Sequence, residues 1–180
     1  REGLAAVTAD MVDEGIGDLS AIDVSERLAR IGAEYDVDVG ADATVFTLTT
    51  LSRFAERGAT LLAEMVTAPS LRDHDFDRVR QLRLDRLRQL KDLAPAVAER
   101  AFLRLLYGSH PYGHLAIGNE QALRRVSLDD VAAFHATVFS PSRATLVVGG
   151  ALKHEELLAV AEGAFGRWAG REDGGEGGNG

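Results

Sequence analysis

Few of the residue types that carry enzyme chemistry stand together in this sequence. The 180 residues include five histidines and no cysteine, which excludes thiolate metal sites and disulfides. His110 and His114 have the i, i+4 spacing with which two histidines on a helix bind zinc, but Pro111 and Gly113 disfavour a helix there. No Ser-His-Asp arrangement or nucleophile elbow is present. We therefore interpret this histidine pair as part of a structural loop and assign no catalytic residue.

The N-terminal residues 3–11 read Gly-Leu-Ala-Ala-Val-Thr-Ala-Asp-Met. This segment resembles the metal-binding helix of the insulinase-type (M16) zinc peptidases, which carries the inverted zincin motif H-x-x-E-H. In that register the first histidine falls on Ala6, the catalytic glutamate on Ala9 and the second histidine on Asp10. The third zinc ligand of the family, a glutamate on a later charged helix, falls on Arg86. The resemblance thus implies a degenerate zinc site and no metal cofactor in this chain.

The similarity to the M16 family continues along the chain to about residue 168. Its most specific stretch is residues 106–113, Leu-Tyr-Gly-Ser-His-Pro-Tyr-Gly, which resembles the loop after the family's long helical stretch. Residues 61–69 and 127–141 resemble an earlier helix and the segment before the family's last strand. The resemblance implies an M16-type domain over residues 1–168 that lacks its N-terminal strands, followed by a flexible Gly-rich, acidic linker at 169–180.

Hydrophobic periodicity predicts helices interrupted by short strands. Helices are expected over residues 3–13, 21–31, 53–67, 73–107 with a break at Ala94-Pro95, 119–124, 128–138 and 152–167. Alternating patterns over 34–39 and 44–51 predict an antiparallel hairpin, and the apolar residues 144–148 predict a buried strand. Strands separated by blocks of helices favour an α+β fold with helices covering a mostly antiparallel sheet. The resemblance implies the M16 peptidase or LuxS-like metallohydrolase form of that fold.

The composition limits the classes of function. A net charge of −8 and a pI of about 5.1 argue against a nucleic-acid partner. No apolar run approaches the roughly 20 residues that a membrane-spanning helix needs. The 18 arginines against two lysines are typical of a GC-rich bacterial source. For the compartment, the periplasm is favoured over the cytoplasm.

In the M16 family two homologous halves enclose a chamber, and often one half carries the zinc while the other lacks it. The resemblance therefore implies a non-catalytic domain, inactive alone, that pairs with a zinc-bearing half, fused or separate. Such a half helps to hold unfolded peptides. We expect an extended peptide to add to an edge strand within residues 44–51, at Thr44, Val45, Phe46 and Thr47.

Two other functions remain open from the sequence. The chain could be a purely structural or assembly subunit of the same fold, like the core subunits of respiratory complexes, with no role in proteolysis. It could also be a hydrolase of another class, which no motif supports. An H-x-x-E-H half next to this chain would favour the peptidase partner.

Overall fold

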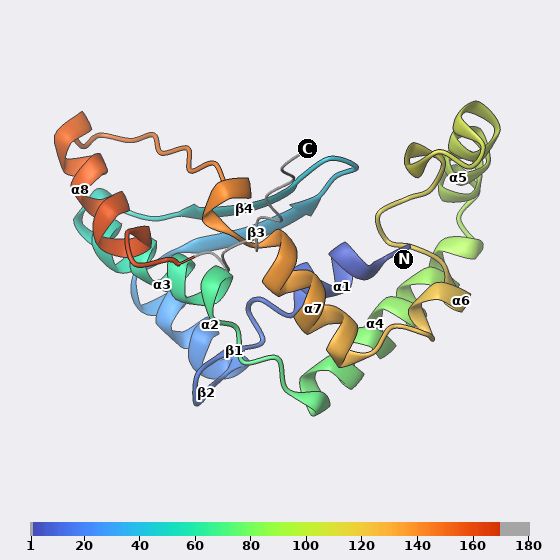
Figure 1. Cartoon of the computed structure of the whole chain (residues 1–180), viewed down its shortest axis with the longest axis horizontal. Coiled ribbons are helices and arrows are strands. Elements are labelled where there is room, and N and C mark those ends of the chain that lie inside the picture. Colours follow the sequence, from blue (N-terminus) through green and yellow to red (C-terminus); the bar gives the residue numbers. More distant parts are fainter. Residues whose placement is uncertain (1, 170–180) are drawn as a thin grey trace, which may run out of the picture.

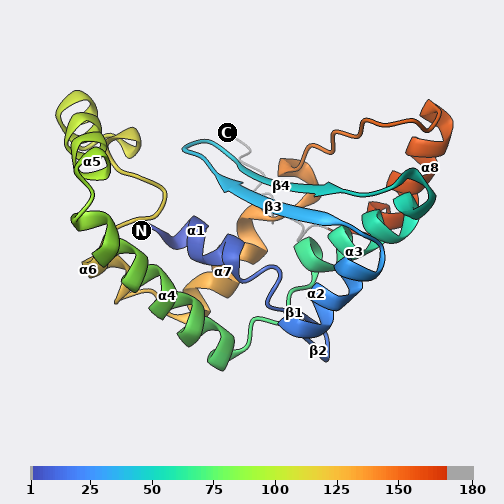
Figure 2. The same ribbon diagram turned by 180° about the vertical axis from the view of Figure 1, so that it is seen from behind.

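The computed structural model describes residues 2–169, which form eight helices and two antiparallel hairpins (Figures 1 and 2). The helices are α1 (Leu4–Asp10), α2 (Ala21–Arg30), α3 (Ala55–Thr67), α4 (Asp73–Lys91), α5 (Ala94–Tyr107), α6 (Glu120–Leu123), α7 (Leu128–Val138) and α8 (His154–Phe165). The strands are β1 (Gly15–Ile16), β2 (Leu19–Ser20), β3 (Glu34–Val39) and β4 (Thr44–Thr49). Short 3-10 turns are η1 (Ser52–Phe54), η2 (Pro111–Gly113) and η3 (Pro141–Arg143). This mixture of helices and antiparallel strands confirms the α+β prediction.

Local signals in the sequence set most helix ends. Ser20 begins α2 with a capping box, in which its hydroxyl accepts from the Asp23 N–H and the Asp23 carboxylate accepts from the Ser20 N–H. Ser127 begins α7 with the same motif. The break in the long helical stretch falls just before the predicted position, at Asp92 and Leu93, so Pro95 lies in the first turn of α5. Residues 170–180 of the expected linker lie outside the described residues.

Helix α1 lies between two hydrophobic clusters and fixes their relative position. Val7 and Met11 belong to a cluster with buried side chains of α4 and the α6–α7 region. Val12, just beyond α1, belongs to a second cluster with α2 and α3, against which Tyr35 of β3 and Phe46 of β4 pack. The segment that carries the degenerate motif is therefore held from both sides.

Strands β3 and β4 form the larger hairpin, in register from Glu34 opposite Thr49 to Val39 opposite Thr44. Within residues 2–169 neither strand has a second neighbour. The Gly40 N–H donates to the Ala43 carbonyl across the turn at 2.9 Å, which makes that pair hydrogen-bonded. Hydrogen-bonded and non-hydrogen-bonded pairs alternate in an antiparallel ladder. The ladder therefore directs the backbone groups of residues 35, 37 and 39 out of the free edge of β3, and those of residues 44, 46 and 48 out of the free edge of β4.

The expected buried strand at residues 144–148 does not form. This segment joins η3 to α8, and no described strand pairs with it. Leu146 and Val148 are about half exposed, and Val147 is 87% exposed. A strand needs a ladder partner for its N–H and C=O groups, and the described chain supplies none here. The prediction of a buried strand at residues 144–148 is therefore wrong for the described chain.

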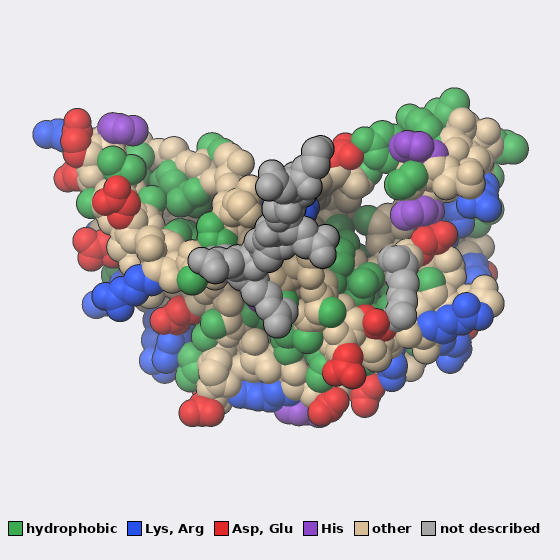
Figure 3. All heavy atoms as spheres, in the orientation of Figure 1, with side chains coloured by type: hydrophobic (Ala, Val, Ile, Leu, Met, Phe, Trp, Pro, Cys, Tyr) green, Lys and Arg blue, Asp and Glu red, His purple; other side chains and the backbone are tan. Residues whose placement is uncertain are grey.

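Helix α5 also differs from the prediction, because its apolar residues face outward. The sequence places Val97, Phe102, Leu105 and Leu106 in a buried stripe, whereas all four are exposed and α5 contains no buried residue. Hydrophobic side chains gather over α5 at the upper right of Figure 3. None of the described helices is both long and apolar enough to cross a membrane.

We expect Val147→Asp to change the free energy of unfolding of this chain by less than about 0.5 kcal/mol, because the side chain is exposed. Leu123→Ala, at a fully buried position, is the control and should cost about 2–5 kcal/mol. Urea unfolding measures both. If residues upstream of Arg1 supply a strand that pairs with residues 144–148, as the sequence predicts, Val147→Asp should become costly in a longer chain, because the carboxylate would be buried. An equally small cost there would contradict the proposed domain boundary.

Candidate functional site

The site begins at α1, whose start depends on glycine. Gly3 has φ +85°, and a Cβ there would lie 2.7 Å from Leu123 Cδ2, so a side chain would be both strained and crowded. One and two turns later, Ala6 and Ala9 are almost completely buried. Asp10 ends the helix and remains partly exposed. The two alanines hold no donor atom in their side chains, so the carboxylate of Asp10 is the only polar group at the three motif positions.

Arg83 of α4 binds the C-terminal part of α1 at this point. Its Nε lies 2.5 Å from Asp10 Oδ2 and its Nη2 lies 2.7 Å from Asp10 Oδ1, a bidentate ion pair. The same Nη2 donates to the Ala6 carbonyl at 2.9 Å. The Arg83 side chain is largely buried, and its fork geometry matches the carboxylate. A guanidinium therefore joins two of the degenerate motif positions.

Arg86, the position expected from the sequence, does not face Asp10. Its Nη1 contacts Gln89 Oε1 at 3.4 Å on the exposed side of α4. Arg83 lies three residues earlier, about one turn back along α4 and roughly 60° around its axis, which is the turn that packs beside Asp10. The structure thus brings Arg83 to the degenerate motif, in place of Arg86.

A cavity of about 330 Å³ adjoins this ion pair between α1, β3 and α4. Its polar lining is mainly acidic, with apolar contributions from α4; the lining residues are Asp10, Asp13, Glu14, Tyr35, Asp36, Val37, Val79 and Leu82. Asp10 is paired with Arg83, and Glu14 with Arg78. Asp13 and Asp36 have no ion-pair partner among the described residues, so the cavity keeps negative charge.

Burial changes the titration of three groups around the cavity. Desolvation raises the pKa of Asp13, with the nearby Asp10 charge adding to the effect. Desolvation also raises the pKa of Glu14, although the guanidinium of Arg78 opposes it. Burial followed by the charge of Asp13 raises the pKa of Tyr35, whose hydroxyl is buried without a hydrogen-bond partner in the described part of the chain. Tyr35 is thus neutral, and its hydroxyl is a donor at the cavity.

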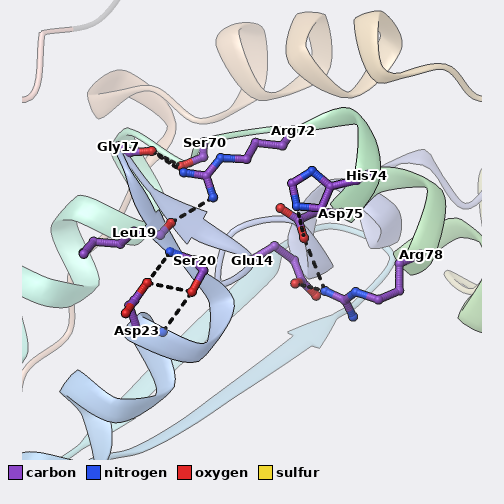
Figure 4. A network of polar contacts seen from close by, with 10 residues as sticks. All are labelled: Glu14, Gly17, Leu19, Ser20, Asp23, Ser70, Arg72, His74, Asp75 and Arg78. Atoms are coloured by element: carbon purple, nitrogen blue, oxygen red, sulfur yellow. Dashed lines mark hydrogen bonds and ion pairs between the residues drawn. The ribbon is translucent and has the colours of Figure 1, made fainter.

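Arg72 of the α3–α4 connection and Arg78 of α4 hold the far side of the site, as Figure 4 shows. Arg78 pairs with Glu14 and lies 3.7 Å from the buried Asp75. Arg72 donates to the carbonyls of Leu19 at 3.1 Å and Gly17 at 2.7 Å. These bonds fasten the β1–β2 hairpin, and with it the end of the α1 segment, to α4.

The strand predicted to bind peptide lies on the other edge of the hairpin. Thr44, Val45, Phe46 and Thr47 are all in β4, but only Thr44 and Phe46 direct their backbone groups outward. The cavity instead borders β3, through residues 35–37. The structure therefore does not bring the predicted strand and the degenerate motif together.

Comparisons with known proteins find relatives of one family. The model of the peptidase M16 inactive domain matches residues 125–179. A non-peptidase homologue, YmxG of Helicobacter pylori, is 25% identical over 87% of this chain and 36% of its own length. The crystal structure of a peptidase M16 inactive domain from Pseudomonas fluorescens is 26% identical and superposes with a TM-score of 0.71 over 75% of this chain and 33% of that one. This chain is thus similar to M16 peptidases and to their inactive domains over most of its length.

The fold is shared more widely than the sequence. The crystal structure of a protease from Helicobacter pylori superposes with a TM-score of 0.91 over 97% of this chain and 42% of that one, at 19% identity. The chain spans about a third of the length of the curated relatives named here. The arrangement of α1, α4 and the β3–β4 hairpin is therefore the M16 fold.

The zinc ion of active M16 peptidases does not fit the residues present here. Ala6 and Ala9 offer no ligand, and both oxygens of Asp10 accept hydrogen bonds from Arg83. The guanidinium would also repel a dication at that position. Residues 2–169 contain no group of three histidine, aspartate or glutamate side chains placed to hold a metal.

Sequence reasoning missed Arg83, although a signal was present. Val79 and Leu87 lie four residues before and after it on the buried face of α4. A charged residue within such an apolar stripe indicates a buried ion pair. Asp13 and Tyr35 had no comparable signal, because their burial depends on tertiary packing around α1 and β3.

Arg83→Ala should lower the free energy of unfolding by about 1–2 kcal/mol, because it removes charge-assisted bonds to a partly solvated carboxylate. Arg86→Ala is the matched control on the same helix and should change it by less than about 0.5 kcal/mol. Thermal or urea unfolding measures both variants. Equal effects would contradict the assignment of Arg83 to the degenerate motif.

Asp13→Asn should stabilise the chain at pH 7. A raised folded-state pKa means that the folded chain holds this proton more tightly than the unfolded chain, so stability falls as pH rises through the carboxyl range. Asparagine removes the charge and its burial cost, and its advantage should disappear at about pH 4 or below. Urea unfolding at both pH values tests this, with Asp36→Asn at an exposed position of the same cavity as control. A gain that is independent of pH would refute the explanation.

Proposed function

We propose that this chain is a non-catalytic M16 domain that pairs with a zinc-bearing half and forms part of the chamber in which peptides are cleaved. The observation that carries the proposal is the Arg83–Asp10 ion pair at the degenerate motif. A guanidinium bonded to a carboxylate and a carbonyl supplies neither a metal ligand nor a general base. Zinc and the catalytic glutamate therefore belong to the partner half, and the isolated chain is inactive.

The contribution of this domain is to hold unfolded peptide as an added strand. The free edge of β3 offers outward N–H and C=O groups at residues 35, 37 and 39, which can pair with any peptide backbone. The cavity beside residues 35–37 keeps negative charge, which favours peptides with basic side chains. The β4 edge, with outward groups at Thr44 and Phe46, is the second candidate for this role.

A purely structural or assembly role is the alternative function. The outward apolar residues of α5 support it, because an exposed apolar helix face is typical of a surface that another domain covers. That role needs no free strand edge and no acidic cavity. Under either role the partner is another M16-type half, and we place the assembly in a bacterial cell, in the periplasm ahead of the cytoplasm.

Peptide binding without cleavage separates the two roles. We expect the chain to bind a fluorescein-labelled, lysine-containing, unstructured 15-residue peptide in an anisotropy assay with zinc present. Chromatography should find the peptide intact, with or without a chelator. Val37→Pro removes one outward donor of β3, where proline is tolerated, and should weaken binding about tenfold. Thr44→Pro makes the same change on the β4 edge and should leave binding unchanged.

Other outcomes decide against parts of this proposal. Chelator-sensitive cleavage by the chain alone would overturn the non-catalytic assignment. A loss of binding in Thr44→Pro but not in Val37→Pro would move the peptide to β4. No peptide binding by the folded chain, checked by circular dichroism, would favour the assembly role.

A further inference from the structure

The loop after α5 is built to aim one tyrosine. Gly108 has φ +59°, and a Cβ on Gly113 would lie 2.5 Å from the Gly108 carbonyl oxygen, so both glycines are needed for the tight path. The Tyr112 N–H donates to His110 Nδ1 at 3.2 Å. The Tyr112 ring meets those of Tyr107 and His110 edge-on, with centroids 5.7 and 4.9 Å away. The direction of the Tyr112 side chain is therefore fixed by its own loop.

Tyr112 reaches the tip of the β3–β4 hairpin. Its hydroxyl donates to Asp42 Oδ1 at 2.6 Å, a contact between residues 70 positions apart. The hairpin tip points toward the loop after α5 in both ribbon views (Figures 1 and 2). The hydrogen bond thus bridges the hairpin and the α5–η2 arm, which otherwise extends from the end of α4.

This bridge stands at one end of the peptide edge proposed above. The outward backbone groups of β3 run from Tyr35 to Val39, a length of about 13 Å at about 3.3 Å per residue. The acidic cavity borders the Tyr35 end, and Asp42 follows the Val39 end directly in the turn. A peptide strand added to β3 and continuing past Val39 would meet the bridge between Asp42 and Tyr112.

We propose that the Tyr112–Asp42 hydrogen bond closes the hairpin-tip end of the β3 edge, so that this domain selects the free ends of unfolded chains over internal segments. The inference rests on the proposed peptide-holding role and names its substrate class. With the bridge closed, a free end fits up to the tip, whereas a chain that continues past Val39 is blocked. With the bridge open, either kind of segment can lie along β3.

The bridge is also suited to opening. Tyr112 and Asp42 are both exposed, so water can replace their hydrogen bond. Helix α5, which carries the loop, contains no buried residue. Segments with few buried contacts open at low cost. A partner that covered the apolar face of α5 would hold the arm in place and keep the edge closed.

Fused peptides test the selection directly. The unstructured lysine-containing peptide is joined to a small folded domain at its N-terminus in one probe and at its C-terminus in another, and both are compared with the free peptide. One fusion should bind at least tenfold more weakly to the unaltered chain, because its folded domain would lie beyond the tip. Tyr112→Phe keeps the ring and removes the bridge, and should restore that binding. Tyr107→Phe is the matched control, since no hydrogen bond to its hydroxyl is present in the described chain, and it should not restore binding.

A crosslink tests the same idea independently of the tyrosine hydroxyl. The chain has no cysteine, so an Asp42→Cys/Tyr112→Cys variant can be joined only at these two positions by a short bis-maleimide. Before crosslinking the variant should bind the free peptide and both fusions alike; after crosslinking it should again reject one fusion. Rejection of either fusion supports the proposal, provided that opening the bridge abolishes that rejection. Which fusion is rejected depends on the direction in which the peptide runs along β3.

The failures of the two proposals are distinguishable. If the unaltered chain binds none of the probes, the peptide-holding role fails. If it binds the free peptide and both fusions equally, the peptide-holding role stands and the Tyr112–Asp42 closure is wrong. The same conclusion follows if it prefers one fusion and neither Tyr112→Phe nor the cysteine variant before crosslinking changes that preference.

Discussion

The ion pair between Arg83 and Asp10 is the interaction on which the rest of this domain depends. It joins α1 to α4 at the degenerate motif, and it binds the Ala6 carbonyl as well. A largely buried guanidinium is tolerable because an opposite charge and a backbone acceptor surround it. The pair thereby holds α1 against α4, and it occupies the one carboxylate at motif positions where Ala6 and Ala9 offer no zinc ligand.

Strain and burial are concentrated around that pair. Asp13 and Glu14 follow α1 directly and carry raised pKa values because they are desolvated, and Tyr35 keeps a buried hydroxyl without a partner. Leu71 has φ 44°, an uncommon value for a branched side chain, just before the arginine that fastens the β1–β2 hairpin. Such groups cost stability, and the two hydrophobic clusters on either side of α1 offset that cost. Groups of this kind are more typical of binding sites than of a uniform core.

Two surfaces of the described chain expose apolar side chains to solvent. Residues 144–148 expose an apolar, extended run with no ladder partner, and α5 exposes its apolar residues along its length. Both features suit a chain that spans about a third of its curated relatives. The apolar pattern in the sequence predicted burial at both places, whereas the structure leaves both exposed within residues 2–169.

The sequence by itself indicated the resemblance to the M16 family, the α+β class, helices that begin after Ser20 and Ser127, and an antiparallel hairpin between residues 34–39 and 44–51. These follow from local propensity and from spacing along one chain. Only the tertiary structure decided that Arg83, rather than Arg86, contacts Asp10. The two arginines are one helical turn apart, and the packing of α4 on α1 decides which of them lies beside a residue 73 positions away. It also decided that the acidic cavity borders β3 and that Tyr112 reaches Asp42. Contacts between distant segments depend on how helices and strands pack, which local patterns do not encode.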